Sequence, residues 1–213
     1  MIDVGWTVAQ SKDCQIDCQT DIDLALKHLR SGGVVAFPTD TLFGLGADVF
    51  SQPALERIFA IKGRVRGQAL PVLVSGWDQV EMVAGNISQR AAKLARSFWP
   101  GALTLVLWRL PQLPDLVTGG GETVAVRMPN HPVPLALAAG LGRPITGTSA
   151  NRSGQADLLS REDVLDQLGD QVGYVVRGGP SPAGVASTVI DLTAGEPRLL
   201  REGALPFHRV LEG

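Results

Sequence analysis

The stretch "FAIKGRVRGQALPVLV" (Phe59–Val74) joins the end of a predicted helix to a predicted buried strand. Its first residues complete the apolar spacing of "QPALERIFAIK", which is typical of a helix, and "LPVLVS" is a short apolar run typical of a strand. Between them lie four groups that can bind an anion: Lys62, Arg64, Arg66 and Gln68. The stretch therefore predicts an α/β fold with either a solvated turn or a phosphate site beside a strand.

The composition limits the class of protein. The chain has 213 residues, 45% of them hydrophobic, and a net charge of −2, so no overall attraction to nucleic acid or to an anionic membrane is expected. No apolar run reaches the roughly 18 residues of a membrane span, and the N-terminus does not resemble a signal peptide. We therefore expect a cytoplasmic protein with two reduced thiols, Cys14 and Cys18, and no protein-bound metal, because zinc-site spacing is missing.

Helical and strand-like patterns alternate along the chain, and no linker or repeat divides it. The consecutive strands near the C-terminus argue against a purely parallel sheet, so we expect one α/β domain with a mixed sheet. Its predicted boundaries are an N-terminal arm (1–19), the domain (20–206) and a C-terminal tail (207–213). The expected helices cover residues 20–31, 52–62, 77–98 with a break near Gly85, 133–139 and 160–169. The expected strands cover residues 34–37, 70–75, 102–110, 123–128, 174–178, 187–192 and 197–202.

Two polar segments follow expected strands. "FPTDTLFGLGADVF" (37–50) places threonines and a Gly-rich turn at a strand end, and "PITGTSANRSG" (144–154) gathers hydroxyls behind two apolar residues. Such residues favour turns and caps, which is the structural alternative, but they also bind phosphate or ribose oxygens. Neither segment matches the dinucleotide fingerprint or the P-loop. Because ligands of open α/β sheets gather at the carboxyl ends of strands, both segments are candidate site walls.

Two arginines lie in or beside apolar strands, Arg127 in "TVAVRM" and Arg201 in "LLREG". A buried arginine needs a partner, so each is expected to form an ion pair or to face a ligand. The sequence suggests no Ser-His-Asp triad and no pair of catalytic carboxylates. The pattern of cations and neutral donors favours electrostatic catalysis on a charged substrate, such as phosphate or nucleotide chemistry with Mg²⁺.

Seven motifs occur in the order of a known family: "FPTDTLFGLG", "IKGR", "WPGALTLVL", "AVRMPNHP", "TSANRSG", "STVIDL" and "LLREG". On these motifs the chain resembles threonylcarbamoyl-AMP synthases of the YrdC type, over roughly residues 22–206. The resemblance implies a twisted α/β domain, with a mixed β-sheet and flanking helices around a positively charged concave cavity. The family signature is Lys-x-Arg followed far downstream by Ser-x-Asn.

The resemblance also implies an activity. Enzymes of this family are nucleotidyltransferases that make L-threonylcarbamoyladenylate and pyrophosphate from L-threonine, bicarbonate and ATP with Mg²⁺. Their product serves N6-threonylcarbamoylation of adenosine 37 in tRNA. The implied partners are these substrates and the downstream enzymes that modify tRNA, with weak RNA binding as an addition and no membrane contact.

Site residues are carried over from the resemblance motif by motif. The implied catalytic residues, which also bind ATP, are Lys62, Arg64, Ser149 and Asn151. The further ATP contacts are Gln68, Thr123 and Arg201. The implied threonine contacts are Thr41, Arg127 and Ser187, and an arginine offers a planar fork suited to a carboxylate.

Several positions depart from the family, and two other functions stay open. Val65 stands where relatives have proline, Ala69 precedes Leu70 where "P-L" is frequent, Leu73 stands where some longer relatives have histidine, and Phe43 where many have tyrosine. These changes leave the nucleotide wall intact and put one threonine contact in question. The alternatives are an RNA-binding or ribosome-maturation module without ATP turnover, and a carbamoyl-transfer unit like that of the much larger hydrogenase maturation proteins.

Overall fold

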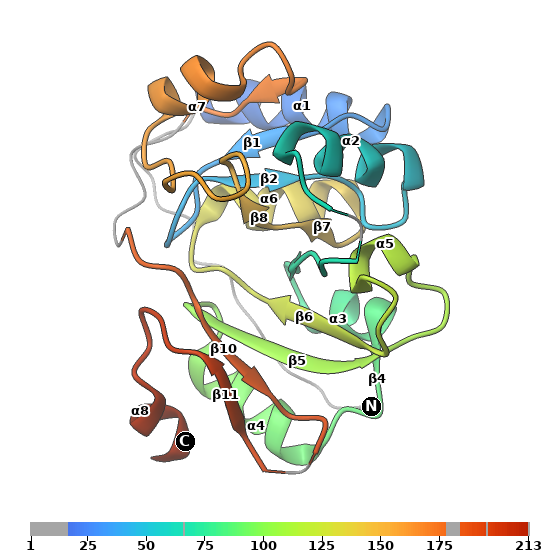
Figure 1. Ribbon diagram of the computed structural model, residues 1–213, viewed down its shortest axis with the longest axis vertical. Coiled ribbons are helices and arrows are strands. Elements are labelled where there is room, and N and C mark those ends of the chain that lie inside the picture. The colour runs from blue at the N-terminus through green and yellow to red at the C-terminus, as the bar shows by residue number, and fades with distance from the viewer. Residues whose placement is uncertain (1–16, 66, 178–183, 195, 213) are drawn as a thin grey trace.

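The computed structural model describes residues 17–65, 67–177, 184–194 and 196–212. Two β-sheets lie one above the other along the long axis of the molecule (Figure 1). The strands are β1 (Val35–Phe37), β2 (Gly44–Gly46), β3 (Val72–Leu73), β4 (Ala84–Gly85), β5 (Leu103–Arg109), β6 (Thr123–Arg127), β7 (Ile145–Thr146), β8 (Thr148–Ser149), β9 (Tyr174–Val175), β10 (Thr188–Asp191) and β11 (Arg198–Arg201). One sheet has the order β8-β2-β1-β9, and the other has the order β11-β10-β5-β6-β3-β7, with β4 paired to β5.

Helices flank both sheets, and their ends follow local sequence signals. They are α1 (Asp17–Arg30), α2 (Gln52–Lys62), α3 (Trp77–Val83), α4 (Gln89–Phe98), α5 (Asp115–Thr118), α6 (Pro132–Leu141), α7 (Arg161–Leu168) and α8 (Phe207–Glu212). The predicted cap of α7 is confirmed, because Ser160 Oγ accepts a hydrogen bond from the Asp163 amide at 3.1 Å. α2 ends at Gly63, whose φ of 57° lies in the left-handed region that glycine tolerates best.

The mixed character of the fold is confirmed, but the strands form two sheets where we expected one. β1 and β9, β3 and β6, and β5 and β10 pair in parallel, whereas the other strand pairs are antiparallel. One large apolar cluster nevertheless includes Phe43 and Leu45 beside the first sheet and Leu103 and Leu105 from the second. Because this cluster is shared by both sheets, the described chain forms one α/β domain, with a second, smaller apolar cluster that includes Leu26, Phe37 and Leu137.

The segment Ile145–Ser149 passes from one sheet to the other. Its first two residues pair with β3 in one sheet and its last two pair with β2 in the other. Gly147 lies at the crossing, and a Cβ atom there would lie 2.4 Å from Cγ of Leu73. Only glycine therefore fits at this position without displacing Leu73, and the polar segment "PITGTSAN" joins both sheets.

The predicted Gly-rich turn is wrong at Gly44–Gly46, which forms strand β2 between β1 and β8. The reason is the ring of Phe37 on β1. A Cβ atom would lie 2.4 Å from this ring at Gly46 and 3.2 Å from it at Gly44. The glycines make room for a fully buried aromatic side chain, a tertiary contact that the pattern of the segment does not reveal.

The ends of the chain differ in detail from the expected boundaries. α1 begins at Asp17, so residues 17–19, which we assigned to the arm, are helical, and residues 1–16 with Cys14 lie outside the described residues, as does Arg66. In the tail, α8 buries Val210 against the main core. The division into arm, domain and tail stays a prediction. Within the described ranges no helix is long and apolar enough to cross a membrane.

Candidate active site

A cavity of about 510 Å³ has walls from both sheets, from the loop after α2 and from the segment that follows β8. Nine of the ten predicted site residues line it: Thr41, Lys62, Arg64, Gln68, Arg127, Ser149, Asn151, Ser187 and Arg201. Thr123 does not. It lies at the start of β6, two positions before Ala125, and the lining of β6 begins only at Ala125. Thr123 is therefore outside the described lining of the cavity, and its ATP contact stays a prediction.

Lys62 connects the end of α2 to the Ser-x-Asn segment. Its ammonium donates to the Ser149 carbonyl at 2.5 Å, to the Asn151 carbonyl at 2.7 Å and to Asn151 Oδ1 at 3.1 Å. Burial, together with the charge of Arg64, lowers the pKa of Lys62 to about 8, against the opposing effect of Asp157. The two halves of the signature are thus one unit, held together through Lys62.

Arg64 lies beyond Gly63 on the rim of the same wall. Its Nε donates to Gln68 Oε1 at 2.6 Å, and its Nη1 reaches Thr148 Oγ1 at 3.5 Å. Burial lowers the pKa of the Arg64 guanidinium. Gln68 therefore orients Arg64, and the guanidinium keeps further N–H donors for a ligand.

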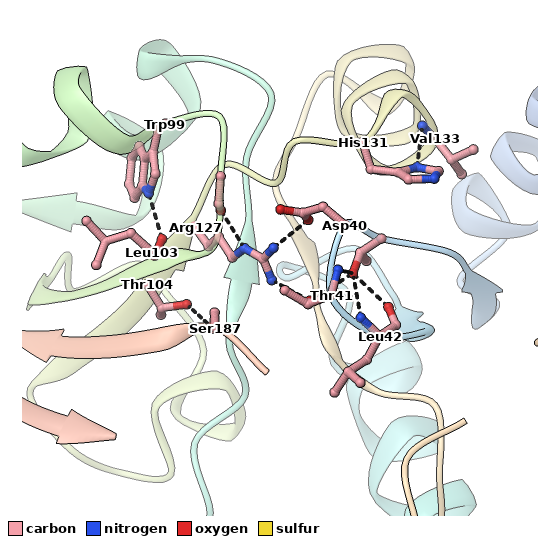
Figure 2. A network of polar contacts seen from close by, with 12 residues as sticks. Asp40, Thr41, Leu42, Trp99, Leu103, Thr104, Arg127, His131, Val133 and Ser187 are labelled. Carbon is pink, nitrogen blue, oxygen red and sulfur yellow. Dashed lines mark hydrogen bonds and ion pairs between the residues drawn. The ribbon is translucent and has the colours of Figure 1, made fainter. Parts of the chain in front are cut away.

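Arg127 is held from three sides, as Figure 2 shows. Its Nε donates to the Gly101 carbonyl at 2.8 Å, its Nη1 donates to Thr41 Oγ1 at 2.9 Å, and its Nη2 forms an ion pair with Asp40. Burial lowers the pKa of Arg127, and the charge of Asp40 opposes this. A guanidinium has five N–H groups, so the described contacts leave two for a ligand.

A compact turn after β1 presents Thr41 to Arg127. Thr39 Oγ1 accepts hydrogen bonds from the amides of Thr41 at 3.0 Å and Leu42 at 3.1 Å, and it donates to the Leu42 carbonyl at 2.7 Å. A hydroxyl that bonds its own backbone in this way fixes a turn. Thr39 belongs to the segment 37–50, which the sequence predicts as a site wall, but it is not among the predicted site residues.

Ser187, directly before β10, and Arg201, at the end of β11, form a second polar group. Arg201 donates to the Ser187 carbonyl through Nε at 3.1 Å and through Nη2 at 2.9 Å. Thr104 Oγ1 lies 2.8 Å from Ser187 Oγ, as drawn in Figure 2. Thr104 was missed at the sequence level, although a polar residue within the apolar run "ALTLVL" was a usable signal.

The cavity is electrostatically positive and has an apolar part. Lys62, Arg64, Arg127 and Arg201 line it, and Asp157 is the one carboxylate among its described lining residues. Nothing in the local sequence marked Asp157 as a site residue. Phe43 and Leu73, two of the four positions that depart from the family, are buried residues of the cavity lining.

Comparison with known proteins identifies the family. A family model named Sua5_yciO_yrdC, described as telomere recombination, matches residues 27–203. The chain belongs to this family. It is 42% identical over 189 residues to the threonylcarbamoyl-AMP synthase of Pyrococcus abyssi, a match that covers 89% of this chain. It is 40% identical to a putative threonylcarbamoyl-AMP synthase of Mycobacterium tuberculosis, over 88% of this chain.

Solved structures of the Sua5/YciO/YrdC family have the same fold. P. abyssi Sua5 complexed with L-threonine superposes with a TM-score of 0.87 at 42% identity over 90% of this chain. E. coli YciO superposes with a TM-score of 0.79 at 29% identity, over 88% of this chain and 91% of its own. The chain spans 56% of the P. abyssi protein and 86% of the M. tuberculosis protein. The expected family and fold are confirmed.

Proposed function

We propose that this protein is a threonylcarbamoyl-AMP synthase, an enzyme that forms L-threonylcarbamoyladenylate and pyrophosphate from L-threonine, bicarbonate and ATP. The names of its relatives and the L-threonine in the P. abyssi Sua5 structure support this activity. The observation that carries it is that one cavity holds two kinds of anion-binding group. Arg127, with two N–H donors left, suits the carboxylate of an amino acid, and Lys62 with Arg64 suits a polyphosphate.

The reaction joins three substrates in two steps. The amine nitrogen of threonine bonds to the carbon of carbon dioxide derived from bicarbonate and loses a proton, which gives a carbamate. A carbamate oxygen then bonds to the α-phosphorus of ATP, the bond to the bridging oxygen breaks, and pyrophosphate leaves with the electron pair. No protein nucleophile takes part, so the side chains bind, orient and stabilise charge.

Three of the four cationic groups of the cavity have a place in this scheme. Arg127 binds the threonine carboxylate in a plane fixed by Asp40 and Thr41. Negative charge grows on the leaving pyrophosphate, and Arg64 and Lys62, which line the same cavity, stabilise it. Ser149 and Asn151 keep Lys62 in position through the bonds to its ammonium.

Mg²⁺ enters this scheme with ATP. The described residues hold no group of three or more His, Cys, Asp or Glu that could bind a metal by themselves. Mg²⁺ typically takes one or two carboxylates together with substrate phosphates, and Asp157 supplies a carboxylate in the cavity wall. The residues present therefore fit a magnesium ion that arrives with the nucleotide, and the ion neutralises phosphate charge when bound.

The product serves N6-threonylcarbamoylation of adenosine 37 in tRNA, so the expected partners are the enzymes that transfer the group to tRNA. With this role, the protein is expected to act in the cytoplasm. Any RNA binding by the chain itself would depend on a local basic surface, because the net charge is −2.

The test is pyrophosphate release from MgATP, measured with and without L-threonine and with and without bicarbonate. Release that needs both threonine and bicarbonate is the expected result. Pyrophosphate release that is independent of threonine, or no release together with salt-sensitive RNA binding, would overturn the synthase activity. Replacement of threonine plus ATP by carbamoyl phosphate separates the carbamoyl-transfer alternative, for which we expect no turnover.

A further inference from the structure

Thr104 is a polar residue at a position where its strand otherwise supplies apolar groups. Its neighbours on β5, Leu103 and Leu105, point to the opposite face and lie in the main core. Thr104 itself is 2% exposed, yet it belongs to the cavity lining. A buried hydroxyl at a substrate cavity needs a hydrogen-bond partner, and that partner indicates its role.

The partner is the hydroxyl of Ser187, 2.8 Å away. β5 and β10 hold the pair in place, because Leu103 pairs with Thr188 and Thr104 pairs with Val189 in a parallel register. Figure 2 shows the two side chains meeting between neighbouring strands. Their distance is therefore set by backbone pairing in the sheet.

Arg201 fixes a second bond to the same oxygen. Its Nη2 lies 3.3 Å from Ser187 Oγ and 2.9 Å from the Ser187 carbonyl. A guanidinium has donors and no acceptor, so Ser187 Oγ must accept in this contact. One lone pair of Ser187 Oγ therefore accepts a hydrogen bond from Arg201, which leaves one lone pair and one hydrogen for other partners.

The direction of the Thr104–Ser187 bond follows from counting donors. A hydroxyl has one hydrogen and two lone pairs. If Ser187 donated, the hydrogen of Thr104 would have no acceptor among the described residues, although the side chain is buried, and such a group is costly. If Thr104 donates, its hydrogen is used, both lone pairs of Ser187 Oγ are occupied, and the Ser187 hydrogen is left for the cavity.

We infer that Thr104 is a positioning residue that makes Ser187 a hydrogen-bond donor to an anionic oxygen of the amino-acid substrate. This inference rests on the proposed function. The oxygen belongs to the carboxylate of threonine or to the carbamate formed from it, both of which only accept. Thr104 touches Ser187 and acts through it, and Arg127 supplies the positive charge in the same cavity.

The experiment compares Thr104→Val, which keeps the shape but removes the hydroxyl, with Thr104→Ser, which keeps the hydroxyl. L-threonine affinity is measured by calorimetry, and kcat and KM are measured from pyrophosphate release. We expect Thr104→Val to weaken threonine binding about tenfold, as for loss of one oriented bond to a charged group. The KM for ATP is expected to change less than about twofold, and Thr104→Ser is expected to restore most of the affinity.

Two further variants separate positioning from packing. Thr118→Val removes a buried hydroxyl at the end of α5, outside the cavity lining, and is expected to leave threonine affinity unchanged. Ser187→Ala is expected to weaken threonine binding more than Thr104→Val does, and the double variant is expected to be no weaker than Ser187→Ala alone.

The outcomes distinguish this inference from the proposed function. Additive losses in the double variant, or equal losses in Thr104→Val and Thr104→Ser, would overturn the positioning role. Wild-type affinity in Thr104→Val would overturn it as well, while leaving the synthase activity in place. Failure of the wild-type protein to bind threonine would overturn both.

Discussion

Besides Arg201, the cavity has two groups of cations: Lys62 with Arg64, which we call the Lys62 wall, and Arg127, which we call the Arg127 wall. Each wall holds its buried cation in a different way. Lys62 is surrounded by three neutral oxygens of Ser149 and Asn151, and its pKa is lowered to about 8. Arg127 is paired with the carboxylate of Asp40 and bonded to Thr41. The direct acceptors of Lys62 are neutral, so its charge is compensated only in part by the more distant Asp157, whereas Asp40 pairs directly with Arg127.

The difference matches the two substrates that we propose. A triphosphate carries several negative charges, so a wall whose positive charge has no direct carboxylate partner attracts it strongly. An amino acid carries both signs, and a compensated arginine recognises its carboxylate by direction more than by net charge. The partner of a buried cation therefore decides its role. A cation with neutral partners attracts an anion by its charge, and a cation with a carboxylate partner binds an anion by the direction of its N–H groups.

Removal of Asp40 gives the largest expected effect. Asp40→Ala leaves Arg127 buried without its carboxylate, because the Arg127 side chain is 7% exposed. Breaking a buried pair in this way costs about 3–5 kcal/mol in free energy of unfolding. The measurement is urea denaturation followed by circular dichroism.

Glu196→Ala is the matched control for Asp40. Glu196 pairs with Arg90, but both side chains are largely in solvent, with exposures of 86% and 40%. Such a pair is worth about 0–1 kcal/mol. If the two substitutions lowered the free energy of unfolding equally, another group would compensate the charge of Arg127. The proposed difference between Lys62 and Arg127 would then be wrong.

Removal of Arg64, which belongs to the Lys62 wall, is expected to give the second-largest effect. Arg64→Ala removes a donor for developing phosphate charge, so kcat is expected to fall about 100- to 1000-fold. Threonine affinity is expected to stay within about threefold, because Arg64 and Arg127 share no hydrogen-bond partner among their described contacts. Arg152→Ala, an exposed arginine outside the cavity lining, serves as the control for a lost positive charge. A fall in threonine affinity equal to the fall in kcat would mean that the walls do not act separately.

The smallest expected effect is a pH dependence of kcat/KM for ATP, which arises from Lys62 alone. Lys62 keeps its proton below its pKa of about 8 and loses it above, so attraction for ATP weakens as pH rises. We expect kcat/KM for ATP to fall roughly tenfold per pH unit above about 8, at saturating threonine. The same profile for threonine reports the substrate amine and Arg127, and it is not expected to fall at this pH. A flat ATP profile up to pH 10 would show that the charge of Lys62 is not used.

Much of the fold could be predicted because its elements carry local signals. The apolar period of α2, the glycine at its end and the serine that caps α7 each act within one or two turns. β2 was not predictable, because Gly44 and Gly46 are strand residues only by virtue of the Phe37 ring against them. The division into two sheets was not predictable either, because it appears only in the pairing of Ile145–Thr146 with β3 and of Thr148–Ser149 with β2.

The sequence by itself determined the chemistry that is available: cations after α2, hydroxyls at strand ends, and two arginines in apolar runs. Only the tertiary structure decided which groups meet, since Lys62 reaches Ser149 across 87 residues and Thr104 reaches Ser187 across 83. The physical reason is that these distances are set by strand pairing and core packing between distant segments. Those contacts fix the partner of each buried charge, and with it the charge balance, the donor direction and the pKa.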